Sequence, residues 1–90
     1  MTTYENAFFC LQQYLTRTFT LPCRSLAAYQ QLQGTLGLSE WEFTEAVVGL
    51  ETRFGVLLPD ESLTPKLTVG ELCALIDQYA GRSYWYHQHT

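Results

Sequence analysis

The residues in this chain whose chemistry is easiest to recognise are its cysteines and histidines. The three cysteines, Cys10, Cys23 and Cys73, are an odd number, lie far apart and include no CxxC pair. This spacing argues against both a disulfide framework and a zinc site. His87 and His89 lie two residues apart, and such a pair needs a third ligand from elsewhere to hold a metal. We therefore expect free thiols and no metal site.

The sequence also lacks the groupings that carry catalysis. Cys23 follows Pro22 in an expected loop, and no histidine lies near it in the sequence to act as a base. No paired carboxylates in apolar surroundings, no Ser/His/Asp grouping and no glycine-rich phosphate loop can be assembled. We predict that the protein is not an enzyme and has no catalytic residues.

The net charge of −4 is unevenly distributed. The stretch 40–61 carries six acidic residues and one arginine, a net charge of −5, whereas the rest of the chain sums to +1. Such a segment repels nucleic acid and anionic lipid and attracts a basic protein surface. Residues 1–15 have no basic start and no unbroken apolar run, so neither a signal peptide nor a membrane span is expected. The expected location is the cytoplasm.

The spacing of apolar residues predicts three main helices in a single domain, over residues 4–17, 39–54 and 68–81. Each is preceded or opened by a Ser or Thr with a Glu three residues later, the pattern of a capping box. Residues 25–34 are expected to form a short helix or irregular helical turns, and residues 60–65 one or two turns at most. These elements together predict a small all-α bundle.

Two connecting or terminal segments carry further expectations. Residues 56–59 are expected to form a short buried connection that Pro59 ends. The tail, residues 82–90, contains the aromatic run Tyr84-Trp85-Tyr86. These rings either fold back onto the bundle or form a contact for a partner. The chain is accordingly expected to be a monomer or a weak homodimer.

The apolar residues of the 39–54 helix fall on two faces. The inward stripe consists of Phe43, Ala46, Val47, Leu50 and Phe54. At about 100° per residue, Trp41 and Val48 lie roughly 150° from this stripe and cannot share the core face. A Trp and a Val among Glu40, Glu45 and Glu51 are typical of a contact surface. The alternative is that the segment preceding this helix covers them.

Several short motifs follow one another without a gap between residues 36 and 77. They are Leu36-Gly37, Glu45, Leu50-Glu51-Thr52-Arg53-Phe54-Gly55, Leu58-Pro59-Asp60-Glu61 and Thr68-Val69. Acyl and peptidyl carrier proteins have Leu-Gly-x-Asp-Ser-Leu, then a helix ending in Leu-Glu-x-x-Phe-Gly, then Ile-Pro-Asp-Glu and a Thr-Val pair. The chain therefore resembles an acyl carrier protein over about half of its length.

The resemblance implies that residues 1–90 form one acyl-carrier-protein-like four-helix bundle, with three main helices plus short helical turns and an up-down-down path. It also implies that the 39–54 helix is the recognition helix. Family members present acidic residues there to basic patches on synthases, reductases and transferases of fatty-acid, polyketide and peptide assembly. The partner-facing positions of the family fall on Glu40, Trp41, Glu45, Val48 and Glu51.

The sequence departs from the family at the site where the phosphopantetheine cofactor is attached. The attachment serine falls on Glu40, the preceding aspartate on Ser39 and the following leucine on Trp41. Attachment needs a hydroxyl that attacks the pyrophosphate of coenzyme A, and a carboxylate is a poor substitute. We therefore expect no cofactor and a binding module that has kept the docking surface.

Two alternatives stay open. In the first, the protein is a true carrier that is modified at Ser39, one residue away. A shift of one position turns a side chain by about 100° and moves it about 1.5 Å along the helix axis, and a helix N-cap hydroxyl is already engaged. In the second, Glu40 is an introduced substitution. Ser39 and Trp41 also depart from the pattern, which favours a natural loss.

Overall fold

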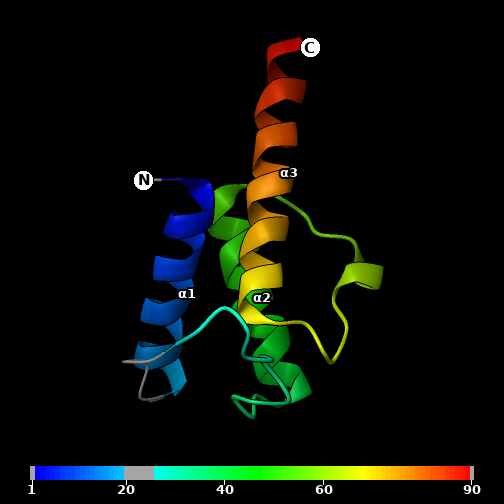
Figure 1. Cartoon of the computed structure of the whole chain (residues 1–90). Coiled ribbons are helices and arrows are strands. Elements are labelled where there is room, and N and C mark those ends of the chain that lie inside the picture. Colours follow the sequence, from blue (N-terminus) through cyan, green and yellow to red (C-terminus); the bar gives the residue numbers. More distant parts are fainter. Residues whose placement is uncertain (1, 20–25, 90) are drawn as a thin grey trace.

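The computed structural model describes the backbone of residues 2–19 and 26–89, and the side chains of residues 2–18 and 26–80. The described residues form the helices α1 (Thr3–Phe19), α2 (Glu40–Phe54), η2 (Asp60–Ser62, a 3-10 helix) and α3 (Val69–His89). Helix α1 runs antiparallel to both α2 and α3 (Figure 1). The predicted all-α class is confirmed for the described residues, which contain one isolated β-bridge and no strand.

The three predicted capping boxes all form. In each, the Ser or Thr hydroxyl accepts a hydrogen bond of 3.1 Å from the Glu N–H, and the Glu carboxylate accepts one of 2.9 Å from the Ser or Thr N–H. The pairs are Thr2 with Glu5, Ser39 with Glu42, and Thr68 with Glu71. These reciprocal bonds satisfy donors that a helix start leaves unpaired, so the sequence defines where α1, α2 and α3 begin.

The helix ends follow the sequence less closely. Helix α2 ends as predicted at Gly55, whose φ of 66° is left-handed and whose N–H donates to the carbonyl of Glu51. The prediction that Gly81 ends α3 is wrong, because the helix backbone continues through Gly81 to His89. A glycine inside a helix costs about 1 kcal/mol relative to alanine, and no proline follows Gly81 to stop the helix. The backbone of residues 82–89, expected to be a tail, is therefore helical.

The core lies where the inward faces of the three helices meet. The buried apolar side chains are Ala7, Leu11 and Leu15 of α1, Phe43, Ala46, Val47 and Leu50 of α2, Val69, Leu72, Cys73 and Ile76 of α3, and Leu32, Leu38, Val56, Leu58 and Leu67 between helices. Helix α1 packs more extensively on α3 than on α2. Phe54, the last member of the predicted inward stripe of α2, is half-buried against this core.

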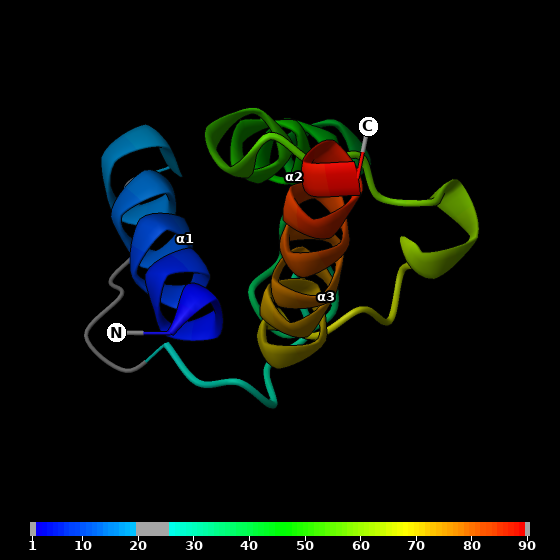
Figure 2. The same ribbon diagram turned by 90° about the horizontal axis from the view of Figure 1, so that it is seen from above.

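The segment 26–38 first passes α1 and α3 on the side away from α2 and then returns to the start of α2, as the two views show (Figures 1 and 2). Of the two forms expected for residues 25–34, the described residues adopt the second, because they form irregular turns and no regular helix. Their backbone groups pair with the chain around Thr68 instead: the Leu32 N–H donates to Leu67, and the Gly70 N–H donates to Ala28. In a helix, Tyr29 and Leu32 would lie on the same face because they are three residues apart. In the turns they do not, and Leu32 is buried while Tyr29 is 80 % exposed.

The connection after α2 is extended, and its side chains alternate. Val56 and Leu58 are buried, as predicted, but Leu57 is 83 % exposed. Successive side chains of an extended backbone point to opposite sides, so a run of three apolar residues cannot all face one core. The prediction that the whole of this connection is buried is therefore wrong for Leu57.

Candidate functional site

The outward face of α2 is open to solvent at the two apolar residues that the sequence singled out. Trp41 is 69 % exposed and Val48 is 49 % exposed, and Glu40 beside them is also exposed. The alternative that the preceding segment covers them is wrong for its described part, because both side chains stay exposed in the presence of residues 26–38. We call Glu40, Trp41, Glu45, Val48 and Glu51 the outer face of α2.

The start of α2 brings the predicted attachment position to the surface. Glu40 is the first helical residue, and Ser39 is the N-cap, with φ −67° and ψ 166°. The Ser39 hydroxyl oxygen accepts the Glu42 N–H, and the Glu40 carbonyl accepts from the Thr44 hydroxyl at 3.0 Å. Both side chains are solvent-exposed. The only hydroxyl of this pair therefore belongs to the capping residue.

The three glutamates of the outer face have different surroundings. Glu40 is exposed, whereas Glu45 and Glu51 are half-buried. The carboxylate of Glu51 accepts the Leu58 N–H at 2.7 Å and so fixes the extended connection to α2. Burial raises the pKa of the Tyr14 phenol, the negative charge of Glu45 raises it further, and a hydrogen bond with Thr18 lowers it. Glu45 thus lies on the side of the outer face that turns towards α1.

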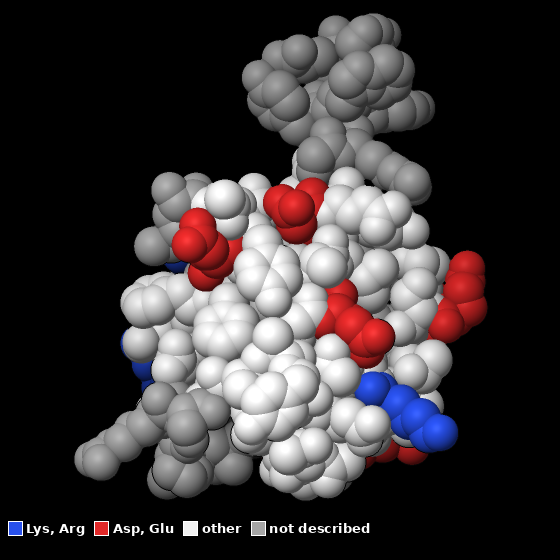
Figure 3. Space-filling model, viewed as in Figure 1, with Lys and Arg blue, Asp and Glu red and all other residues white. Residues whose placement is uncertain are grey.

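A hollow of about 460 Å³ borders the outer face on its other side. Glu40, Val48 and Glu51 line it from α2, and Asp60, Leu63 and Pro65 line it from the connection to α3. Acidic side chains therefore stand on both walls of this hollow. The opposite side of the molecule differs, because uncharged side chains cover its centre and the acidic ones lie apart from each other (Figure 3).

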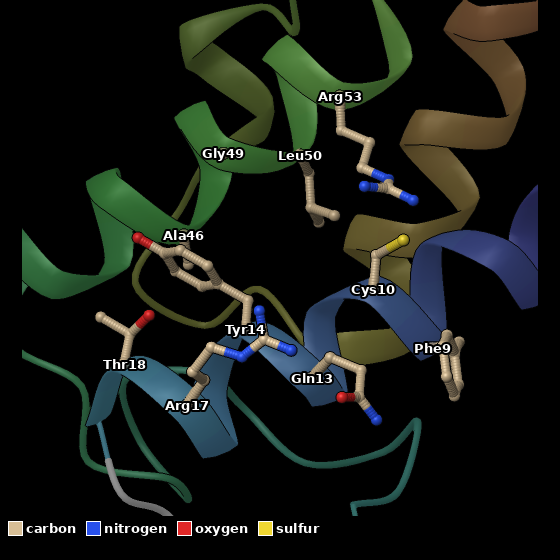
Figure 4. Close-up of a pocket in the computed structure, with 10 residues that line it drawn as sticks. All are labelled: Phe9, Cys10, Gln13, Tyr14, Arg17, Thr18, Ala46, Gly49, Leu50 and Arg53. Carbon is tan, nitrogen blue, oxygen red and sulfur yellow. The ribbon is translucent and has the colours of Figure 1, made fainter.

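A second hollow, of about 350 Å³, lies between α1 and α2 (Figure 4). Arg17 of α1 and Arg53 of α2 both line it, together with Tyr14, Gly49 and other residues. This groove was not predicted from the sequence. Its arginines sit in the last turns of two antiparallel helices, where a basic residue is ordinary, so only their positions in space distinguish them.

The two described cysteines differ in burial. Cys10 is half-buried and Cys73 is fully buried, and both are free thiols. Burial, and to a lesser extent Cys10, raises the pKa of Cys73 to about 12. A thiol with such a pKa carries almost no thiolate at neutral pH and is not a nucleophile there. Cys23, which the sequence places in a loop, lies outside the described residues.

The described residues also bear on metal binding and on membrane insertion. Within the part of the chain that the structure describes, no three His, Cys, Asp or Glu side chains gather closely enough to hold a metal ion. The expectations for His87 and His89 and for the rings of Tyr84, Trp85 and Tyr86 concern side chains outside the described ones. Among the described residues, no helix is both long and apolar enough to cross a membrane.

The chain was also compared with known proteins. No protein-family model, no curated protein and no solved structure matches it.

Proposed function

We propose that this protein is a non-enzymatic binding module of the acyl carrier protein type that has lost the attachment serine. In this proposal, the outer face of α2 docks on basic patches of enzymes that build fatty acids, polyketides or nonribosomal peptides. The module regulates or scaffolds such enzymes instead of delivering a thioester. The sequence motifs between residues 36 and 77 support the assignment, and the path of three helices with α1 antiparallel to α2 and α3 is compatible with it.

The observation that carries the proposal is the exposure of Trp41. A tryptophan that is 69 % exposed at the start of a capped helix leaves a large apolar surface in water. Val48, seven residues later, lies about two helical turns away on the same face. Tryptophan is among the residues most often found to dominate binding energy at protein interfaces, where polar residues rim an apolar centre.

Charge supports the same surface. The stretch 40–61 carries a net charge of −5, and four of its six acids belong to the outer face or to the hollow beside it, namely Glu40, Glu45, Glu51 and Asp60. Complementary charge speeds association and fixes the orientation of the two partners more than it raises affinity. We therefore expect the association to weaken as the ionic strength rises, because exposed charges are screened by salt.

The chemistry of the attachment position supports a module without a cofactor. Glu40 offers a carboxylate where the family has its serine, and the neighbouring Ser39 uses its hydroxyl oxygen to cap α2. The competing function is a true carrier that bears phosphopantetheine on Ser39. Ser39 is exposed, so a modifying enzyme could reach its hydroxyl.

The two functions differ in the intact mass of the protein. After incubation with coenzyme A and a broad-specificity phosphopantetheinyl transferase, the chain should keep its mass, because no hydroxyl lies in the register that the enzyme reads. An acyl carrier protein with its serine, added to the same reaction, controls for enzyme activity. A gain of one pantetheine arm that disappears in Ser39→Ala would establish the true carrier and refute the proposal.

A further inference from the structure

The proposed docking through the outer face of α2 gives no role to the groove between α1 and α2. It exists because α1 packs mainly on α3, so α1 and α2 approach each other less closely. The residues along this seam are also small: Ala46 and Gly49 face it from α2, and Cys10 faces it from α1. Together with Leu50, they give the groove an apolar floor. Its volume of about 350 Å³ is at the lower end of the range for sites that bind small molecules.

Two cations border this apolar floor. Figure 4 shows Arg17 reaching from α1 and Arg53 reaching from α2 into the space between the helices. The ten described residues that line the groove include these two arginines and no acidic residue. This is the reverse of the hollow on the other side of α2, whose walls are acidic. In a chain of net charge −4, the groove is thus a local site of positive charge.

The polar groups in the groove limit where an anion can lie. The phenol of Tyr14 already feels the negative charge of Glu45, so an anion beside that hydroxyl would be repelled. The guanidinium groups are the favourable positions, because arginine forms charge-assisted hydrogen bonds with carboxylates and phosphates. Phe9, 54 % exposed at the edge of the groove, offers apolar surface for the rest of a ligand.

We propose that the α1–α2 groove binds a small amphipathic anion, with its carboxylate or phosphate on Arg17 or Arg53 and its apolar part between Cys10, Leu50 and the Tyr14 ring. The charge of the arginines selects the anionic head, and the small size of the residues in the seam makes room for the apolar part. The site is separate from the outer face of α2 and does not depend on its function.

The test is a titration followed by amide NMR shifts, with octanoate and octyl phosphate as probes. Both should bind and shift the amides of the groove residues, and the tighter of the two identifies the preferred head group. Octanol, which lacks the charge, and inorganic phosphate, which lacks the apolar part, should each bind at least about tenfold more weakly. Arg17→Gln and Arg53→Gln change exposed side chains, so both variants should fold.

The variants give the decisive comparison. At least one of Arg17→Gln and Arg53→Gln should weaken the better probe by about tenfold, whereas Lys66→Gln should leave its affinity unchanged. Lys66 is a matched control because it is an exposed cation that does not line the groove. The proposal fails if neither probe binds, if octanol binds as well as octanoate, or if Lys66→Gln weakens binding as much as the groove variants do.

Discussion

The triple variant Ser39→Asp/Glu40→Ser/Trp41→Leu should acquire a phosphopantetheine arm under the conditions in which the native chain acquires none. It restores the Asp-Ser-Leu sequence of carrier proteins at the positions that the motifs between residues 36 and 77 assign to it. Aspartate is as good a helix N-cap as serine, so the start of α2 is kept. Glu40 and Trp41 are exposed, and replacing them opens no cavity in the core.

Intact mass spectrometry measures whether the variant has gained the mass of one phosphopantetheine arm. The double variant Ser39→Asp/Trp41→Leu, which lacks the new serine, is the matched control and should stay unmodified. A triple variant that folds, as judged by its helical circular dichroism, but gains no mass would show that the register placing Glu40 at the attachment position is wrong. The resemblance would then no longer assign the attachment position to Glu40.

Two glycine-to-alanine substitutions in helices should change stability in opposite directions. A Cβ at Gly70, near the start of α3, would lie 2.9 Å from the Ala28 Cβ and 3.1 Å from the Ala28 carbonyl oxygen. Backbone must move to relieve this overlap, and overpacking typically costs 1–3 kcal/mol. The higher helix propensity of alanine offsets part of this cost. Gly70→Ala should therefore lower the free energy of unfolding by about 1–2 kcal/mol.

At Gly49, in the middle of α2, a Cβ would meet only the Tyr14 ring, at 3.7 Å, which is an ordinary contact. Alanine is also favoured over glycine in a helix, so Gly49→Ala should raise the free energy of unfolding by about 0.5–1 kcal/mol. Urea denaturation of both variants measures the difference. Equal effects, or a tolerated Gly70→Ala, would contradict the close packing of segment 26–38 on α3.

The helix starts and the inward stripes were predictable because both depend on residues close together in sequence. A capping box needs only two residues three positions apart, and all three formed as expected. The exposure of Trp41 and Val48 followed in the same way from the angles between residues on one helix.

What the sequence did not predict depends on contacts between distant residues. The path of segment 26–38 is fixed by backbone hydrogen bonds to residues around Thr68, and these have no sequence pattern. The continuation of α3 past Gly81 illustrates a related limit, since a glycine favours a helix end but does not require one. The groove is formed by residues from two helices that are far apart in sequence, so no single segment revealed it.

The bond from Leu58 to Glu51 is instructive for the candidate site. The resemblance assigned Glu51 to the partner-facing surface, but Glu51 is half-buried and its carboxylate accepts a backbone hydrogen bond. A substitution there would alter the connection after α2 as well as the surface charge. Trp41, whose exposed side chain is large and lies at the start of the helix, is therefore the better residue for testing docking.

The most direct test of the account is the affinity of the Trp41→Ala variant for purified condensing enzymes of fatty-acid, polyketide and peptide assembly that carry basic docking patches. Tyr29→Ala is the matched control, because Tyr29 is an aromatic residue that is 80 % exposed on segment 26–38 and does not belong to the outer face of α2. The account predicts that the chain binds at least one of these enzymes and that Trp41→Ala weakens this binding about tenfold or more, whereas Tyr29→Ala leaves it unchanged and neither variant shifts the thermal midpoint. Absence of binding to every such enzyme, or an equal loss in both variants, would contradict it.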